Sequence, residues 1–264
     1  MPSTERESGA DSPSSTLAVE EGVATIRPIR IWIHVIALGI VAGVVAWLAG
    51  EACLNIVQPR RHAIVDRGIA LNVSDRRGEA NATAANAGLA FILLGGLLGA
   101  ALGAAGGRIR GSNRAAGSAA AVGLGAGALG AALVSLAILP AYNAYRLSHP
   151  DEASRDLILP LLVHVGVWAT AGAAGGLALG VGLGLGDRRA ILNVVLGGLI
   201  GAAVGATVFE LVGAFAFPTA ETARYVSRTG PTRLLARLLV CVCAAGGVAA
   251  AAVDALGRRS DVAA

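Results

Sequence analysis

Residues 95–107 read GGLLGAALGAAGG, and in this stretch glycine recurs at every fourth position, at Gly95, Gly99, Gly103 and Gly107. Residues four apart share one face of an α-helix, so these glycines predict a bare groove that a neighbouring helix can approach closely. The same spacing recurs later in the chain, at Gly172, Gly176, Gly180 and Gly184 and again at Gly197, Gly201 and Gly205. We expect all of these glycines to pack helices together as glycine zippers.

The stretch from Ala80 to Gly107 contains no charged residue. It exceeds the roughly 20 apolar residues that cross a bilayer core. The whole chain of 264 residues is 55% hydrophobic and 14% charged, with a mean hydropathy of +0.68, whereas soluble domains carry about 25% charged residues. The sequence therefore predicts an all-α integral membrane protein, because backbone exposed to lipid must satisfy its own hydrogen bonds.

Six apolar runs are long enough to be transmembrane helices. We expect them at about 31–57, 83–107, 115–141, 157–186, 190–217 and 234–256. Together they form one transmembrane domain over residues 29–257. A polar, serine-rich tail (1–28) precedes it and is expected to be disordered, and a short tail (258–264) follows it.

The six spans pair into three two-helix hairpins with shared features. The first helix of each hairpin is expected to end at a proline, namely Pro59, Pro140 and Pro218. The second helix of each contains a Gly-Gly pair and leads to an arginine cluster, beginning at Arg108, Arg188 and Arg258. These features predict a threefold internal repeat, whose copies would be parallel and related by an axis along the membrane normal.

Two of the polar connections are informative. The segment 60–79 contains the apolar clusters 64–65 and 69–71, which predict a short amphipathic helix lying along the membrane interface. The short connection 108–114 carries three arginines and no acid. The positive-inside rule therefore places both termini in the cytoplasm. The lack of a cleavable signal pattern and of any lysine suggests a bacterial inner (plasma) membrane, crossed several times.

Ionisable residues inside the spans are the first place to look for function, because each costs on the order of 2.5–3.5 kcal/mol at the bilayer centre. Glu51 and Glu210 each lie eight residues before a proline, and the middle hairpin has Ala132 at that position. His164 and Arg237 lie in the same half of the membrane. We expect Arg237 to neutralise Glu210, with Glu51 and His164 facing the same interior.

This cluster supports a small-solute or ion transporter or channel, in which a carboxylate pair and a histidine relay protons or hold a cation. The alternative is that the cluster is purely structural. Arg237 and Glu210 then form an interhelical ion pair, while Glu51 and His164 reach toward the lipid headgroups. The alternative function is a non-catalytic membrane scaffold or accessory subunit that binds partner helices through its Gly/Ala grooves. Trp47 and Trp168 are expected to pack as large apolar plugs.

Several functional classes find no support in the sequence. No nucleophile–base pair, phosphate-binding loop or metal-ligand spacing is present, so we expect no catalytic residues, no cofactor and no metal. The net charge of +4 comes from arginines scattered over the connections rather than from a basic stripe, so no nucleic-acid partner is expected. The expected partners are the lipid bilayer and either a second copy of the chain or another membrane protein.

Overall fold

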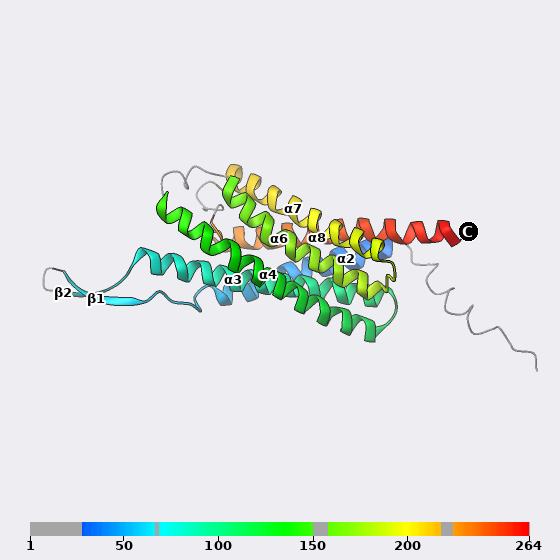
Figure 1. The fold of residues 1–264 in the computed structure, drawn as a ribbon, viewed down its shortest axis with the longest axis horizontal. Coiled ribbons are helices and arrows are strands. Elements are labelled where there is room, and N and C mark those ends of the chain that lie inside the picture. Colours follow the sequence, from blue (N-terminus) through cyan, green and yellow to red (C-terminus); the bar gives the residue numbers. More distant parts are fainter. Residues whose placement is uncertain (1–27, 67–68, 150–157, 218–223, 264) are drawn as a thin grey trace, which may run out of the picture.

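The computed structural model describes residues 28–66, 69–149, 158–217 and 224–263. Six long helices make up nearly all of this structure (Figure 1): α2 (Pro28–Cys53), α3 (Arg76–Ile109), α4 (Asn113–Ser148), α6 (Ile158–Leu183), α7 (Arg188–Ala216) and α8 (Gly230–Ala263). Each is long and apolar enough to cross a membrane. The predicted all-α integral membrane fold with six spans is confirmed.

The structure describes almost none of the predicted N-terminal tail and almost all of the predicted C-terminal tail. Most of the N-terminal tail lies outside the described residues. At the other end, α8 continues to Ala263, through most of the residues expected to form a C-terminal tail.

The predicted amphipathic helix between the first two spans is wrong. This segment forms a β-hairpin of two antiparallel strands, β1 (Arg61–Asp66) and β2 (Ile69–Ser74), which extends beyond the end of the bundle in Figure 1. Its apolar positions are mostly β-branched, with isoleucine and valine at 64, 65, 69 and 73. Such side chains favour strands over helices because their χ1 freedom is restricted in a helix.

Two of the three prolines, Pro59 and Pro140, do not end a helix as predicted. Helix α4 runs through Pro140 to Ser148, and α2 already ends at Cys53, before Pro59. Proline removes one helical hydrogen bond, which membrane helices tolerate when neighbouring groups support the backbone. Here the last turns of α4 are held by Asn143, whose Nδ2 donates to Asn81 Oδ1 of α3 at 2.7 Å. Pro218 lies outside the described residues.

The six helices form an inner and an outer set. The most hydrophobic windows of α3, α6 and α8 are 61%, 56% and 44% buried, against 33%, 28% and 28% for α2, α4 and α7. Each outer helix contacts two inner ones: α2 contacts α3 and α8, α4 contacts α6 and α3, and α7 contacts α8 and α6. Every outer helix therefore lies between its own hairpin partner and the inner helix of another hairpin.

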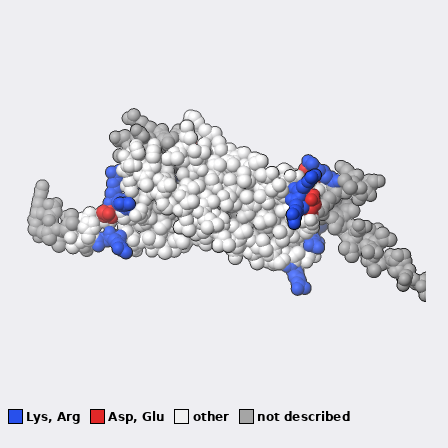
Figure 2. Space-filling view, in the orientation of Figure 1, with Lys and Arg blue, Asp and Glu red and all other residues white. Residues whose placement is uncertain are grey.

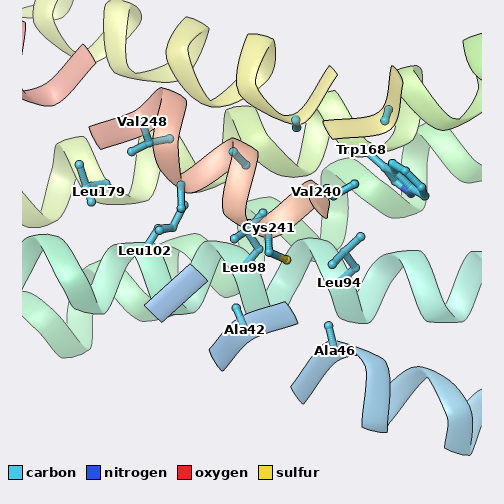
Figure 3. Packing of buried hydrophobic residues seen from close by; sticks show 14 of the residues in the cluster. Ala42, Ala46, Leu94, Leu98, Leu102, Trp168, Leu179, Val240, Cys241 and Val248 are labelled. Carbon is cyan, nitrogen blue, oxygen red and sulfur yellow. The ribbon is translucent and has the colours of Figure 1, made fainter. Parts of the chain in front are cut away.

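The core between these helices is built largely from small and aliphatic side chains. Figure 3 shows Ala42 and Ala46 of α2 facing Leu94 and Leu98 of α3, with Cys241 of α8 beside them. Their small volume allows the helix backbones to approach closely, which favours van der Waals packing where lipid supplies no hydrophobic drive.

Most of the glycines singled out in the sequence lie where two backbones meet. A Cβ at any of nine of them would fall less than 3.0 Å from a backbone atom of a facing helix; these are Gly95, Gly99, Gly103, Gly107, Gly172, Gly176, Gly197, Gly201 and Gly205. Gly180 and Gly184 differ. A Cβ on Gly180 would make only ordinary contacts, and Gly184 follows the end of α6 with φ +70°. That left-handed conformation favours glycine and terminates the helix.

Side-chain caps set the starts of α3, α4 and α7. Asp75, Ser112 and Asp187 each accept a hydrogen bond from a backbone N–H of the first turn. Because Asp187 is the N-cap, the two arginines that follow it already belong to α7. Just after α2 ends, Asn86 of α3 holds the following segment, since its Nδ2 donates to Leu54 O at 2.8 Å and Val57 O at 3.0 Å.

The surface matches a membrane-spanning body. Figure 2 shows charged side chains gathered at the two ends of the molecule, with a wide uncharged band between them. Exposed leucine, isoleucine and valine side chains occupy that band, among them Leu133, Leu136 and Ile200. One end of the bundle carries the β-hairpin; we call it the hairpin end, and the half of the bundle next to it the hairpin half. At the opposite end α2 begins and α8 finishes, because these two helices run antiparallel.

Candidate functional site

A small cavity lies within the hairpin half of the bundle, between α2, α3, α6, α7 and α8. Its volume is about 20 Å³. It is lined by polar side chains from three helices (Glu51, His164, Arg233, Arg237), by aromatic side chains, and by the segment 224–227 that precedes α8. We call it the polar cavity. The cavity extends from buried Trp168 to exposed Arg224 at the hairpin end.

His164 and Glu210 form a buried pair across the α6–α7 interface. His164 Nδ1 contacts Glu210 Oε1, and the two side chains are 2% and 10% exposed. The other ring nitrogen, Nε2, lies 3.3 Å from the carbonyl oxygen of Tyr225. With Nε2–H donated to that carbonyl, the Nδ1–Oε1 contact contains one proton that either partner can hold.

Glu51 pairs with an arginine that the sequence reasoning did not include in the cluster. Arg233 at the start of α8 donates to both carboxylate oxygens of Glu51, with Nε–Oε1 at 2.5 Å and Nη2–Oε2 at 2.7 Å. Arg233 also donates through Nη1 to the carbonyls of Ser227 and Arg228. A bidentate pair of this kind has a fixed geometry. The signal in the sequence was the spacing of Arg233 and Arg237, which places them one turn apart on α8.

Arg237 does not form the predicted ion pair with Glu210. It is 6% exposed, and among the described residues no carboxylate oxygen lies within 4.0 Å of it. Its guanidinium instead lies over the ring of Phe91, with Cζ 5.3 Å from the ring centroid. The pairing differs from the prediction because Glu210 faces α6, where His164 is within reach, and not α8.

Aromatic rings form the wall of the cavity around this pair. The His164 ring stacks on Trp168 with centroids 4.7 Å apart and planes 22° apart, and Phe209 packs against both. Tyr225, just before α8, is buried and packs edge-on against Tyr142 of α4 with centroids 5.1 Å apart. These contacts hold the imidazole in place and exclude lipid from it.

Unpartnered hydrogen-bond donors concentrate at this cavity. In the described part of the chain, five buried polar side-chain atoms lack a hydrogen-bond partner, and four belong to residues that line the polar cavity: Trp47 Nε1, Trp168 Nε1, Tyr225 Oη and Arg237 Nη1. A buried polar atom left unsatisfied costs about 1–3 kcal/mol. The two tryptophans, expected to be apolar plugs, therefore also bring donors to the site, which no sequence spacing indicated.

The remaining candidate groups show no arrangement for metal or redox chemistry. Cys53, Cys241 and Cys243 are free thiols. Within the described ranges, no group of three or more histidine, cysteine, aspartate or glutamate side chains could hold a metal ion.

Comparison with known proteins adds no relative. No protein-family model, no curated protein and no solved structure matches this chain. Its function is therefore inferred from the chemistry of the polar cavity.

Proposed function

We propose that this membrane protein is a small-solute or ion transporter or channel, with Glu51, His164, Glu210 and Arg237 as its polar lining. One observation carries the proposal. Glu51, His164 and Arg237 come from three different helices and line the same cavity, while Glu210 is bonded to His164. Ionisable groups that meet inside a membrane bundle are typical of solute and ion pathways.

The energetics favour a role beyond structure. Arg237 is buried in an apolar span without a carboxylate partner among the described residues. A charge in that position is costly, and a merely structural site would pair it. The His164–Glu210 pair adds a buried contact in which one proton can sit on either partner. Together they provide a charged ligand site next to a proton carrier.

The scaffold alternative has weaker support. Its grooves would have to receive partner helices, but nine of the glycines expected to line them already lie against backbone of the chain's own helices. Packing within the molecule therefore uses the surfaces that a scaffold would offer.

The cyclic pattern of contacts supports the proposed threefold repeat. Each outer helix packs between its own inner partner and the inner helix of another hairpin, as parallel repeats around an axis along the membrane normal would. The arginine-rich 108–114 connection supports cytoplasmic termini, and we propose the bacterial plasma membrane as the location.

Thiol labelling tests whether the cavity opens to water. The native Cys53, Cys241 and Cys243 are replaced by alanine, and a single cysteine is introduced at Ala90, which lines the cavity, or at Phe209, which lines it beside Glu210. A membrane-impermeant thiol reagent is larger than the cavity, so modification requires opening of the bundle. We expect both positions to be labelled in membranes.

The matched control is Leu211→Cys, on the other side of Glu210 and 55% exposed on the outer surface of α7. It should resist the reagent, because a thiol in hydrocarbon stays protonated and inaccessible. Resistance of Ala90→Cys and Phe209→Cys under every condition would contradict transport through this cavity.

A further inference from the structure

The polar cavity is rich in donors and poor in free acceptors. The indole N–H groups of Trp47 and Trp168 and the guanidinium of Arg237 can only donate hydrogen bonds. All three have a buried donor atom without a partner in the described structure. The carboxylates at the cavity already have partners. Glu51 accepts two hydrogen bonds from Arg233, and Glu210 contacts His164.

The fourth donor, the Tyr225 hydroxyl, keeps its proton. Burial raises the pKa of Tyr225 above its ordinary value, so the phenol stays neutral across the physiological range. Tyr225 is among the residues that line the cavity, and it brings to that lining a neutral, unpartnered hydroxyl rather than a competing negative charge.

The charges around the cavity also leave a positive excess. Arg233 and Glu51 compensate one another across the α2–α8 interface. His164 and Glu210 share one proton across the α6–α7 interface, so this pair is neutral as a whole whichever partner holds it. Arg237 then remains as a buried positive charge over the Phe91 ring, and the Glu51 carboxylate that attracts it is already bound to Arg233. An anion would complete both the charge balance and the hydrogen bonding of the four donors.

The size of the cavity limits what can enter. A space of about 20 Å³ holds about one water-sized particle. A halide is close to this size. Sulfate, phosphate and organic carboxylates need more room than the cavity offers.

We propose that the polar cavity binds one small monovalent anion of halide size, held by Arg237 and by the donors of Trp47, Trp168 and Tyr225. As a transported substrate this anion depends on the proposed transport function, whereas its binding is measurable without transport.

The two tryptophans make binding directly observable. Trp47 and Trp168 line the cavity, and the third tryptophan, Trp32, is removed as Trp32→Phe. The purified protein in detergent is titrated with sodium bromide at constant ionic strength, with sodium gluconate as the balancing salt, because bromide quenches indole fluorescence on contact. We expect saturable quenching that chloride reverses and sulfate does not.

Variants then assign the binding to the cavity. Arg237→Gln should weaken bromide affinity at least about tenfold, and Arg237→Lys should restore part of it, since a charged hydrogen bond contributes more than a neutral one. Tyr225→Phe, which removes a single oxygen atom, should weaken affinity about threefold to tenfold. The matched controls are Arg258→Gln, an exposed arginine of α8 paired with Asp254, and Tyr145→Phe. Both should bind bromide as the parent does.

Quenching that never saturates, or that saturates with equal affinity in Arg237→Gln and Tyr225→Phe, would overturn the inference and leave water as the occupant. If Arg237→Gln fails to fold, Tyr225→Phe carries the test alone. Chloride flux into proteoliposomes separates the two proposals. Saturable binding without flux or thiol labelling would refute transport and support the anion site, and labelling without saturable binding would refute the anion site only.

Discussion

The hairpin half of the bundle and the half near the chain ends are packed in different ways. Near the chain ends, backbone meets backbone, as where Gly99 of α3 faces Gly123 of α4 and Gly172 of α6 faces Gly198 of α7. In the hairpin half, large buried side chains such as Phe91, Phe209 and Trp168 separate the helices. Side-chain size sets the distance between packed helices.

This difference explains where the polar cavity lies. Glycine contacts leave no room for a ligand, whereas bulky rings of irregular shape leave spaces between them that polar groups can line. The half with backbone contacts is therefore the more closely packed one, and the half with large side chains contains the polar cavity.

The three outer helices extend the comparison. Glu51 of α2 and Glu210 of α7 each form an ion pair with another hairpin's inner helix. At the corresponding position α4 has Ala132, which lines an apolar groove of about 470 Å³ against α3. An acid thus coincides with a closed polar contact, and alanine with an open apolar groove.

The largest effect is expected from breaking the buried pair in the hairpin half. His164→Leu leaves the Glu210 carboxylate buried without its partner and should lower the free energy of unfolding by about 3–5 kcal/mol. Adding Glu210→Leu should recover most of that loss, which a double-mutant cycle in detergent measures. As the control, Asp254→Asn removes an exposed ion pair and should cost less than about 1 kcal/mol. Equal costs for His164→Leu and Asp254→Asn would refute the importance of the buried pair.

A smaller effect is expected in the half near the chain ends. Gly123→Ala forces a methyl group against the backbone of Gly99 and should destabilise the protein by about 1–3 kcal/mol. Two residues further along α4, Gly125 is exposed with nothing within 4 Å of a Cβ. Gly125→Ala should instead stabilise by about 0.5–1 kcal/mol, through helix propensity. Thermal unfolding of the pair checks this, and equal shifts would show that the α3–α4 backbone contact does not limit packing.

The smallest effect is expected where α3 contacts the segment that follows α2. Asn86→Ala removes three hydrogen bonds to the segment that follows α2, two donated to carbonyls and one accepted from Val57 N, and should cost about 1–2 kcal/mol. Asn193, which is exposed on α7, provides the control, since Asn193→Ala should change the unfolding free energy by less than about 0.5 kcal/mol. A larger loss at Asn193 than at Asn86 would contradict the role of these hydrogen bonds.

Sequence reasoning recovers the helices better than the connections. Spans such as 157–186 and 190–217 lie within a few residues of α6 and α7, because apolar runs of membrane length leave the backbone no alternative to a helix. The β-hairpin was missed because a short segment with mixed apolar clusters has no strong period. Pro140 was misjudged because contacts from α3 hold the turns that follow it.

The candidate site was only partly accessible from the sequence. Glu51, His164, Glu210 and Arg237 stand out as charges in apolar runs, and their shared membrane depth follows from counting residues along the helices. Their partners do not follow from counting, because rotation of each helix decides which neighbour a side chain faces. Arg233 as the partner of Glu51, and Tyr225 beside His164, come from segments distant in sequence.

The sequence by itself determined that the chain crosses a membrane six times and that its helices have bare faces, because hydropathy and the spacing of glycine are properties of single segments. Only the tertiary structure decided which faces meet, which acid pairs with which base, and that four residues with unpartnered donors line one cavity. Those outcomes depend on the packing of several helices at once, and no single segment encodes it.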